Sequence, residues 1–167
     1  MTIDLEPLRG LTIFSGLSPD HLRRLAAVLR RRVTDGGTQI LAEGERTTSL
    51  FILARGRVST TKRLGFAVHG QADVAKQKLL VHIEAPQVFG EMALLSDQER
   101  SATVTAAIEC ELLELRREDF ERLAADDLAF GFQLTRNIAV VLAERLRRTD
   151  RDVLNLTAAL SLALGNR

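Results

Sequence analysis

Hydrophobic periodicity changes twice along this chain, near residues 33 and 117, and these two changes limit the possible folds more than any other property. Between them, short apolar runs such as Leu50–Leu53 and Leu79–Ile83 are separated by glycines and polar clusters. From Ser101 to Ile108, apolar residues occupy every second position, which is typical of a half-buried strand. Many short strands with turn signals between them predict a jelly-roll-like β-barrel, with the polar segment 62–78 as a long hairpin tip.

A helix is expected before the strands. Ser18 is a natural N-cap, and Pro19 suits the first position of a helix. Apolar residues then recur at helical spacing as far as Leu29. Residues 30–32 are all arginine, and they are expected to close the helix because cations are favoured at its carbonyl end.

Helical periodicity returns after Arg117. A short helix is expected from residue 118, and a longer one is expected to start near Leu128 and to continue into the 150s or 160s. Along the longer helix, steps of four and three residues separate the positions of one narrow seam: Leu142, Leu146, Thr149, Val153, Leu156, Leu160 and Ala163. A seam this narrow favours packing against another helix, so we expect a homodimer; the alternative is that the helix folds back on its own barrel.

Composition and charge exclude several classes of protein. Hydrophobic residues make up 46% of the chain, enough for one domain with a core and an appended element. The formal net charge of +1 gives no global electrostatic reason to bind nucleic acid or an acidic membrane. The N-terminus lacks a signal-peptide pattern, and the longest uncharged run, 153–166, is too short to span a bilayer. The single thiol, Cys110, cannot form an internal disulfide, which favours a cytoplasmic protein.

The segment 89–104 has the residues of an anion site. Gly90 follows a strand-like run and precedes a short helix-forming stretch, so ligands can approach unpaired backbone N–H groups there. Arg100 can donate a planar fork of hydrogen bonds to the same anion, and Ser101 adds a hydroxyl. A carboxylate at Glu91 makes sense beside an anion only if the ligand also carries hydroxyl groups. These residues indicate a sugar phosphate; the alternative is a structural salt bridge between Glu91 and Arg100.

This segment resembles the phosphate-binding cassette of the cyclic-nucleotide-binding domain family, most of all that of the catabolite-activator (Crp/Fnr) class. The similarity lies in Phe89-Gly-Glu, the following run of small residues and leucines, and Arg100-Ser-Ala. It extends to Ile13–Ser18, to Leu50–Val58 with its glycine, and to 112–120. The resemblance implies an α+β fold: a cyclic-nucleotide-binding β-roll with an N-terminal helix over residues 1–125, and a long C-terminal dimerisation helix over residues 126–167.

The resemblance also implies roles for individual residues. Glu91 would accept a hydrogen bond from the ribose 2′-hydroxyl, and Arg100 and Ser101 would contact the cyclic phosphate. Gly90 and Met92 would contribute backbone groups at the sugar and phosphate. Leu80 would line the apolar side of the base pocket.

Thr149 falls where the catabolite-activator class places a threonine that contacts adenine. This implies cyclic AMP as the ligand, with cyclic GMP as the other possibility. It also places one residue of the helical seam against the base. The next position, a serine that reaches the partner subunit's nucleotide in that class, is Asp150 here, which puts the contact between subunits in doubt.

Features that the sequence lacks argue against several functional classes and leave a few others open. Catalysis has no candidate nucleophile–base pair or paired carboxylates, so the chain is not expected to be an enzyme. No metal or cofactor is expected: a lone Cys110 cannot hold an iron–sulfur cluster, although a haem role for the three histidines stays open. Too few residues follow Leu160 for a helix-turn-helix domain, so direct DNA binding by this chain is not expected. The remaining alternatives are a ligand-free dimeric interaction module and a fragment of a longer Crp/Fnr-type regulator.

Overall fold

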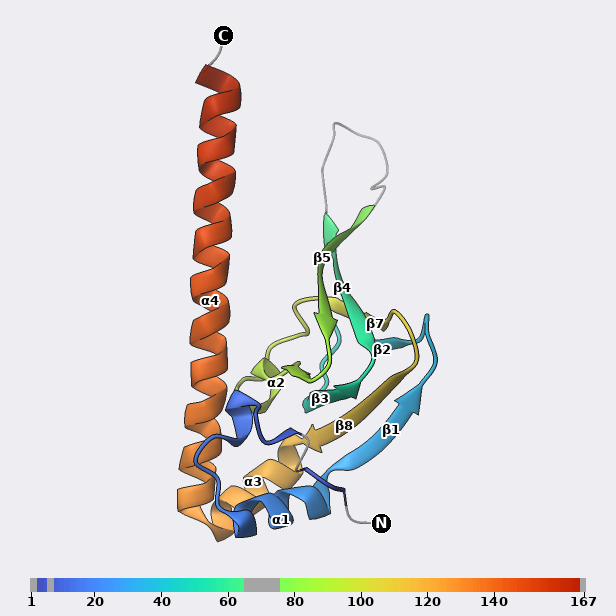
Figure 1. Cartoon of the computed structure of the whole chain (residues 1–167), viewed down its shortest axis with the longest axis vertical. Coiled ribbons are helices and arrows are strands. Elements are labelled where there is room, and N and C mark those ends of the chain that lie inside the picture. Colours follow the sequence, from blue (N-terminus) through green and yellow to red (C-terminus); the bar gives the residue numbers. More distant parts are fainter. Residues whose placement is uncertain (1–2, 6–7, 65–75, 166–167) are drawn as a thin grey trace.

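The computed structural model describes residues 3–5, 8–64 and 76–165. Figure 1 shows a β-roll with helices gathered at one end and a single long helix beside it. In chain order the elements are η2 (Thr12–Phe14), α1 (Pro19–Val28), β1 (Arg30–Thr34), β2 (Gln39–Leu41), β3 (Ser49–Arg55), β4 (Arg57–Leu64), β5 (Lys76–Glu84), β6 (Gln87–Phe89), α2 (Met92–Leu95), β7 (Thr103–Ala106), β8 (Cys110–Arg116), α3 (Arg117–Asp126) and α4 (Leu128–Gly165).

The strands of the described residues form two four-stranded antiparallel sheets. One has the order β1-β8-β3-β6 and the other the order β2-β7-β4-β5. The predicted α+β, jelly-roll-like fold with flanking helices is confirmed, with one refinement. The two sheets make an open roll rather than a closed barrel.

Strand β3 explains why a continuous apolar run occurs where alternation would be expected. Leu50 and Ile52 pack into a core formed with the helices, whereas Phe51 and Leu53 pack into a second core between the sheets. Both faces of the strand are therefore buried, which removes the requirement for polar residues on either face. The helical core ties β3 to the start of α4 through residues such as Leu134.

Helix α1 begins as predicted but ends earlier than predicted. The Ser18 hydroxyl accepts a hydrogen bond from the His21 backbone N–H (3.1 Å), and Pro19 is the first helical residue. The expectation that residues 30–32 close this helix is wrong, because they lie in β1 and pair with β8. Leu29 is the C-cap, with an extended backbone and a buried side chain, and Arg31 then forms an ion pair with Glu111 across the sheet (2.7 Å).

The predicted strand from 101 to 108 is shorter than expected. Strand β7 covers only Thr103–Ala106, and Ile108 lies beyond it with 47% of its surface exposed. Thr103 is buried although it is polar, because its hydroxyl accepts a hydrogen bond from the Glu43 backbone N–H (3.1 Å). The ends of the predicted hairpin tip, 62–64 and 76–78, belong to β4 and β5. The rest of that tip lies outside the described residues.

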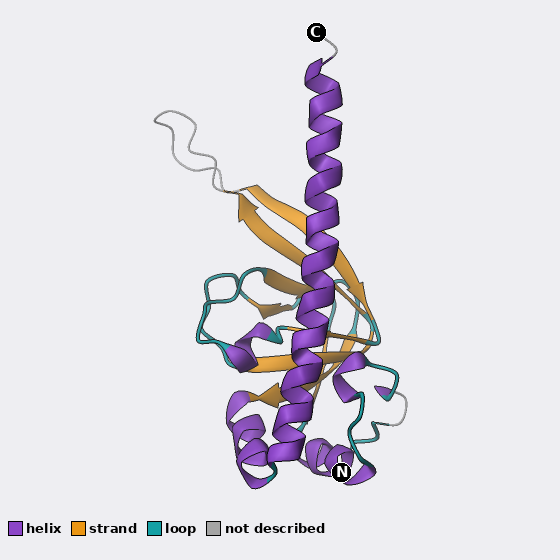
Figure 2. Cartoon of the chain, turned by 90° about the vertical axis from the view of Figure 1, so that its left-hand side faces the viewer, coloured by secondary structure: helices purple, strands orange, loops and turns teal. Residues whose placement is uncertain are grey.

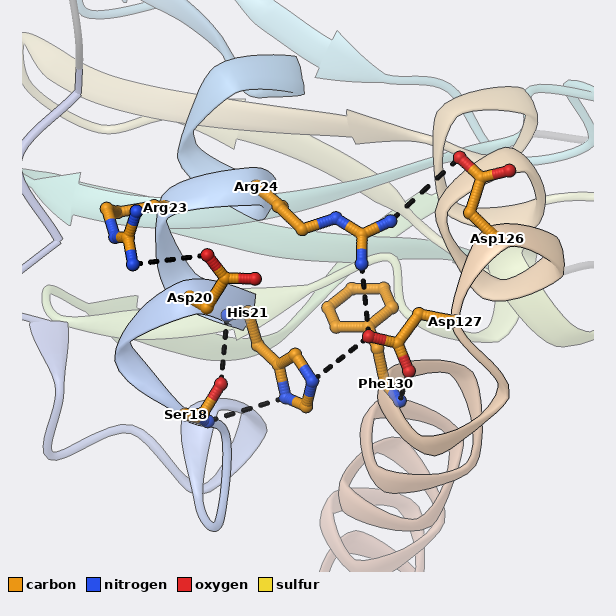
Figure 3. Close-up of polar contacts among 8 residues, drawn as sticks. All are labelled: Ser18, Asp20, His21, Arg23, Arg24, Asp126, Asp127 and Phe130. Carbon is orange, nitrogen blue, oxygen red and sulfur yellow. Dashed lines mark hydrogen bonds and ion pairs between the residues drawn. The ribbon is translucent and has the colours of Figure 1, made fainter.

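Helix α4 starts at Leu128, directly after a residue that fixes its first turn. Asp127 accepts a hydrogen bond from the Phe130 backbone N–H (3.0 Å), and it pairs with His21 (3.2 Å) and Arg24 (3.0 Å) of α1. Figure 3 shows these side chains converging on one carboxylate between the two helices. The beginning of α4 is therefore held against α1 by hydrogen bonds and ion pairs as well as by the core.

The second half of α4 extends past the sheets, as Figures 1 and 2 show. Its apolar side chains there are exposed in this single chain, including Leu146 (63%), Val153 (54%) and Leu160 (62%). No helix within the described ranges combines the length and hydropathy needed to cross a bilayer.

Candidate functional site

A pocket of about 520 Å³ lies between the β2-β7-β4-β5 sheet, α2 and α4. One of its walls is apolar, with Leu41, Ile83, Phe89 and Val104. All of the residues predicted for the site from the sequence line this pocket: Leu80, Gly90, Glu91, Met92, Arg100, Ser101 and Thr149. The chain thus brings together residues from β5, the segment around α2, and α4.

Arg100 is only 6% exposed, and its hydrogen-bond partners in the protein are neutral. Its guanidinium donates from Nε to Thr47 Oγ1 (2.7 Å), from Nη1 to the Gly90 carbonyl oxygen (3.0 Å) and from Nη2 to the Ser49 carbonyl oxygen (2.6 Å). A guanidinium has five N–H donors, so these bonds do not exhaust its capacity. Arg100 also forms no ion pair with any carboxylate of the described residues.

Burial lowers the pKa of Arg100 from its ordinary value, and the more distant carboxylates of Glu45, Glu91 and Glu114 oppose this change. The group remains a cation at neutral pH because the guanidinium is so strongly basic. A desolvated cation without a close counter-ion is costly. An anion that enters the pocket would therefore gain a charge-assisted partner that is already oriented.

Gly90 is required beside Arg100 for two reasons. Its φ angle is +72°, a conformation that side chains disfavour. A Cβ atom there would also lie 2.9 Å from Nη1 of Arg100. The glycine therefore lets the guanidinium reach the backbone at the entrance to α2.

Glu91 is 3% exposed, and its two carboxylate oxygens differ in their surroundings. Oε1 accepts a hydrogen bond from Nη1 of Arg145 on α4 (2.7 Å). Oε2 is buried and has no hydrogen-bond partner among the described residues. The alternative of a salt bridge between Glu91 and Arg100 is not what the structure has, because the ion pair is with Arg145. A buried acceptor without a donor is unfavourable, and a ligand hydroxyl could supply that donor.

Arg145 is the site residue that the sequence analysis missed. It lines the pocket, pairs with Glu91, and donates from Nη2 to the Val88 carbonyl oxygen. The available signal was its position one helical turn before Thr149, which places both residues on the same face of α4. Its partner lies 54 positions earlier in the chain, a pairing that no local pattern reveals.

Thr149 and Met92 lie at the rim of the pocket rather than at its bottom. The Thr149 hydroxyl donates to the Arg145 carbonyl oxygen of its own helix (3.1 Å), and the residue is exposed. Met92 is 50% exposed and Leu80 is 52% exposed. These exposed side chains surround the opening, whereas Glu91 and Arg100 are fixed inside.

The histidines give no support for a metal or haem role in the described part of the chain. His82 pairs with the Ser59 hydroxyl (3.1 Å), and His21 belongs to the cluster that holds α4. Those ranges contain no group of three potential metal ligands. His69 lies outside the described residues. Cys110 is buried, as a small core residue would be.

Comparison with known proteins adds independent information. The family model for the cyclic nucleotide-binding domain matches residues 31–127. The cyclic AMP receptor protein of Thermus thermophilus is 33% identical over 151 residues, 87% of this chain and 62% of that protein. The cAMP-activated global transcriptional regulator Vfr of Pseudomonas aeruginosa is 30% identical over 137 residues, 80% of this chain and 58% of that protein.

A solved structure agrees with these sequence matches. The crystal structure of the Thermus thermophilus catabolite activator protein has a TM-score of 0.70 and 30% sequence identity with this chain. The similarity covers 87% of this chain and 63% of the other. The chain therefore spans about three fifths of the length of each of these proteins.

Proposed function

Because this chain belongs to the cyclic nucleotide-binding domain family, we propose that it is a receptor for cyclic AMP. The observation that supports the proposal most is that two buried polar groups in one pocket lack a partner. Arg100 is a buried cation without a close carboxylate, and Glu91 has a buried oxygen without a donor. A cyclic nucleotide supplies a negative phosphate for Arg100 and a ribose hydroxyl for Glu91.

The proposed roles follow from the chemistry of each group. The free N–H groups of Arg100 and the hydroxyl of Ser101 bind the phosphate, and backbone groups of Gly90 and Met92 complete that end of the pocket. Oε2 of Glu91 accepts from the 2′-hydroxyl. The base lies toward Leu80 and the apolar wall. The pocket volume is within the range of about 300–1,000 Å³ that is usual for small-molecule sites.

We propose that α4 transmits the binding event. Arg145 already links α4 to Glu91, and Thr149 lies at the rim where a base would emerge. In this proposal two copies of α4 pair through the seam, and the ligand shifts the pair between two arrangements. Both curated relatives described above are named for cyclic AMP, which supports adenine as the base, with cyclic GMP as the alternative.

Two other proposals concern the setting of the domain. Since the relatives are longer than the matched region, the receptor could form the sensory part of a Crp/Fnr-type regulator, and DNA binding is not proposed for the residues present. A cytoplasmic, non-catalytic protein fits the single thiol of Cys110 and the absence of candidate catalytic residues in the sequence. A ligand-free dimeric module is less well supported, because it leaves Arg100 and Glu91 without a reason for their burial.

Calorimetric titration of the protein with cyclic AMP, cyclic GMP and cyclic di-GMP tests the proposal. We expect cyclic AMP to bind most tightly and Arg100→Leu to lose about 30- to 3,000-fold in affinity, since truncating one partner of a desolvated charge pair costs about 2–5 kcal/mol. Arg46→Leu is the matched control, because that arginine is 77% exposed and its ion-pair partner among the described residues is the exposed Glu99. Absence of binding by the parent protein, or equal binding by Arg100→Leu, would refute the proposal.

A further inference from the structure

Helix α2, which forms one wall of the pocket, has only four residues and cannot be stable alone. The last carbonyl groups of any helix have no partners inside it. In α2 the Ser96 backbone N–H and the Ser96 hydroxyl both bond to the Met92 carbonyl oxygen (3.0 and 3.3 Å). The carbonyl groups of Ala93 and Ser96 must find partners elsewhere.

Arg117, the first residue of α3, supplies those partners. Its Nε and Nη2 donate to the Ala93 carbonyl oxygen (3.0 and 2.5 Å), and Nη2 also donates to the Ser96 carbonyl oxygen (2.5 Å). Its Nη1 pairs with Asp97. The side chain is only 16% exposed, whereas that of Asp97 is 88% exposed. The hydrogen bonds to the two carbonyl groups therefore account for most of the stabilisation that Arg117 gives α2, because an exposed ion pair contributes little stability.

The backbone of Arg117 is itself fixed. Its N–H donates to the carbonyl oxygen of Thr48, the residue before β3 (2.9 Å), and its helix packs against α4 and α1. Arg117 thus joins the C-terminal end of α2 to a rigid part of the molecule. At the other end of α2, Glu91 is joined to α4 through Arg145.

We infer that Arg117 is a positioning residue for the ligand pocket: it holds α2, and with it Glu91 and Met92, in the geometry that binds a nucleotide, although it does not line the pocket itself. The identity of the ligand in this inference rests on the proposed function, whereas the effect of Arg117 on α2 does not. Without the guanidinium, α2 would leave this geometry more often. The apparent affinity for the nucleotide would then fall in proportion to the fraction of molecules that keep the binding geometry.

Two measurements on Arg117→Gln test the inference. In the ligand-free protein, hydrogen exchange should become faster at the α2 amides, those of Leu94 and Ser96, while exchange in α1 stays unchanged. In calorimetry, affinity for cyclic AMP should fall about 10-fold, corresponding to a competent population near one tenth. Arg117→Lys should recover part of both effects, because an ammonium can still donate to carbonyl oxygens. Asp97→Asn should behave as the parent.

The outcomes separate this inference from the proposed function. If Arg117→Gln only lowers the melting temperature, with parental exchange in α2 and parental affinity, Arg117 is merely structural and the inference is overturned. If the parent binds no cyclic nucleotide, the proposed function fails. The exchange measurement still decides in that case whether Arg117 holds α2.

Discussion

Thr149 has a hydroxyl whose donor is already used within its own helix. It donates to the Arg145 carbonyl oxygen (3.1 Å), so its oxygen remains free to accept a hydrogen bond. The adenine base carries an amino donor at the position where guanine carries a carbonyl oxygen. An accepting hydroxyl at the rim of the pocket would therefore favour adenine over guanine by one hydrogen bond.

We expect Thr149→Ala to weaken cyclic AMP binding about 3- to 10-fold, because one hydrogen bond contributes about 0.5–1.5 kcal/mol. The preference for cyclic AMP over cyclic GMP should narrow, as measured by calorimetry with both nucleotides. Thr157→Ala is the matched control, since that hydroxyl makes the same kind of bond to the Val153 carbonyl oxygen (2.8 Å) away from the pocket. If Thr149→Ala binds both nucleotides as the parent does, α4 does not contact the base.

The junction between α3 and α4 depends on the carboxylate of Asp127. The Phe130 N–H lowers the pKa of Asp127 most, and His21 and Arg24 add to that effect. Since the pKa is lower in the folded state than in the unfolded state, the carboxylate stabilises the fold at pH values above its unfolded pKa. That stabilisation is lost as the pH falls through the folded pKa.

Asp127→Asn should therefore lower the melting temperature at neutral pH by about 1–3 °C, a modest change because an asparagine still caps the helix. The difference from the parent should shrink at pH values below about 4, where the parent carboxylate also becomes protonated. Melting curves recorded between pH 3 and 8 measure this. Asp126→Asn is the control, because Asp126 is 64% exposed and 3.9 Å from Arg24. A difference that persists unchanged in acid would show that the charge has no part in the junction.

Elements were predictable where the sequence signal is local. The N-cap at Ser18, the start of α4 near Leu128 and the residues around Gly90 all lie in short segments with strong preferences, and the structure places each of them as expected. Predictions that depended on distant partners did worse. The arginines after Leu29 pair with β8 instead of ending a helix, and Arg145 pairs with Glu91 from far along the chain. The division of the chain at residue 125 and the nucleotide contacts of each site residue stay predictions.

The arrangement of the strands as an open roll also depends on partners that are distant in the sequence. Alternating and continuous apolar runs identify strands, but they do not say which strands pair. The two faces of β3 belong to different cores because α4 and α1 cover one side of its sheet and the second sheet covers the other. That arrangement is a property of the whole molecule, so the sequence predicted a jelly-roll-like β-barrel without showing how its strands divide between the two sheets.

Several large apolar side chains are exposed on the free half of α4. Leu146, Val153 and Leu160 are each more than half exposed there, and they repeat with heptad spacing. Burying a leucine or valine side chain contributes about 1.5–3 kcal/mol, so the proposed pairing of two copies of α4 along this seam would gain free energy from burying these residues. The flanking charges between 147 and 152 would stay in solvent at the edges of such a pair.

Leu146→Glu combined with Val153→Glu should therefore give monomers in light scattering at protein concentrations where the parent is a dimer. Four carboxylates would then face one another at seam positions that had been apolar, and the dimer dissociation constant should rise more than 1,000-fold. Leu154→Glu combined with Leu162→Glu is the matched control: these leucines are 68% and 75% exposed and lie outside the seam, so this variant should stay dimeric. A parent that is monomeric at high concentration, or a control that dissociates as readily as the seam variant, would mean that α4 does not pair through this face. Transmission of a binding signal would then have to run within one chain, through Arg145 and the junction at Asp127.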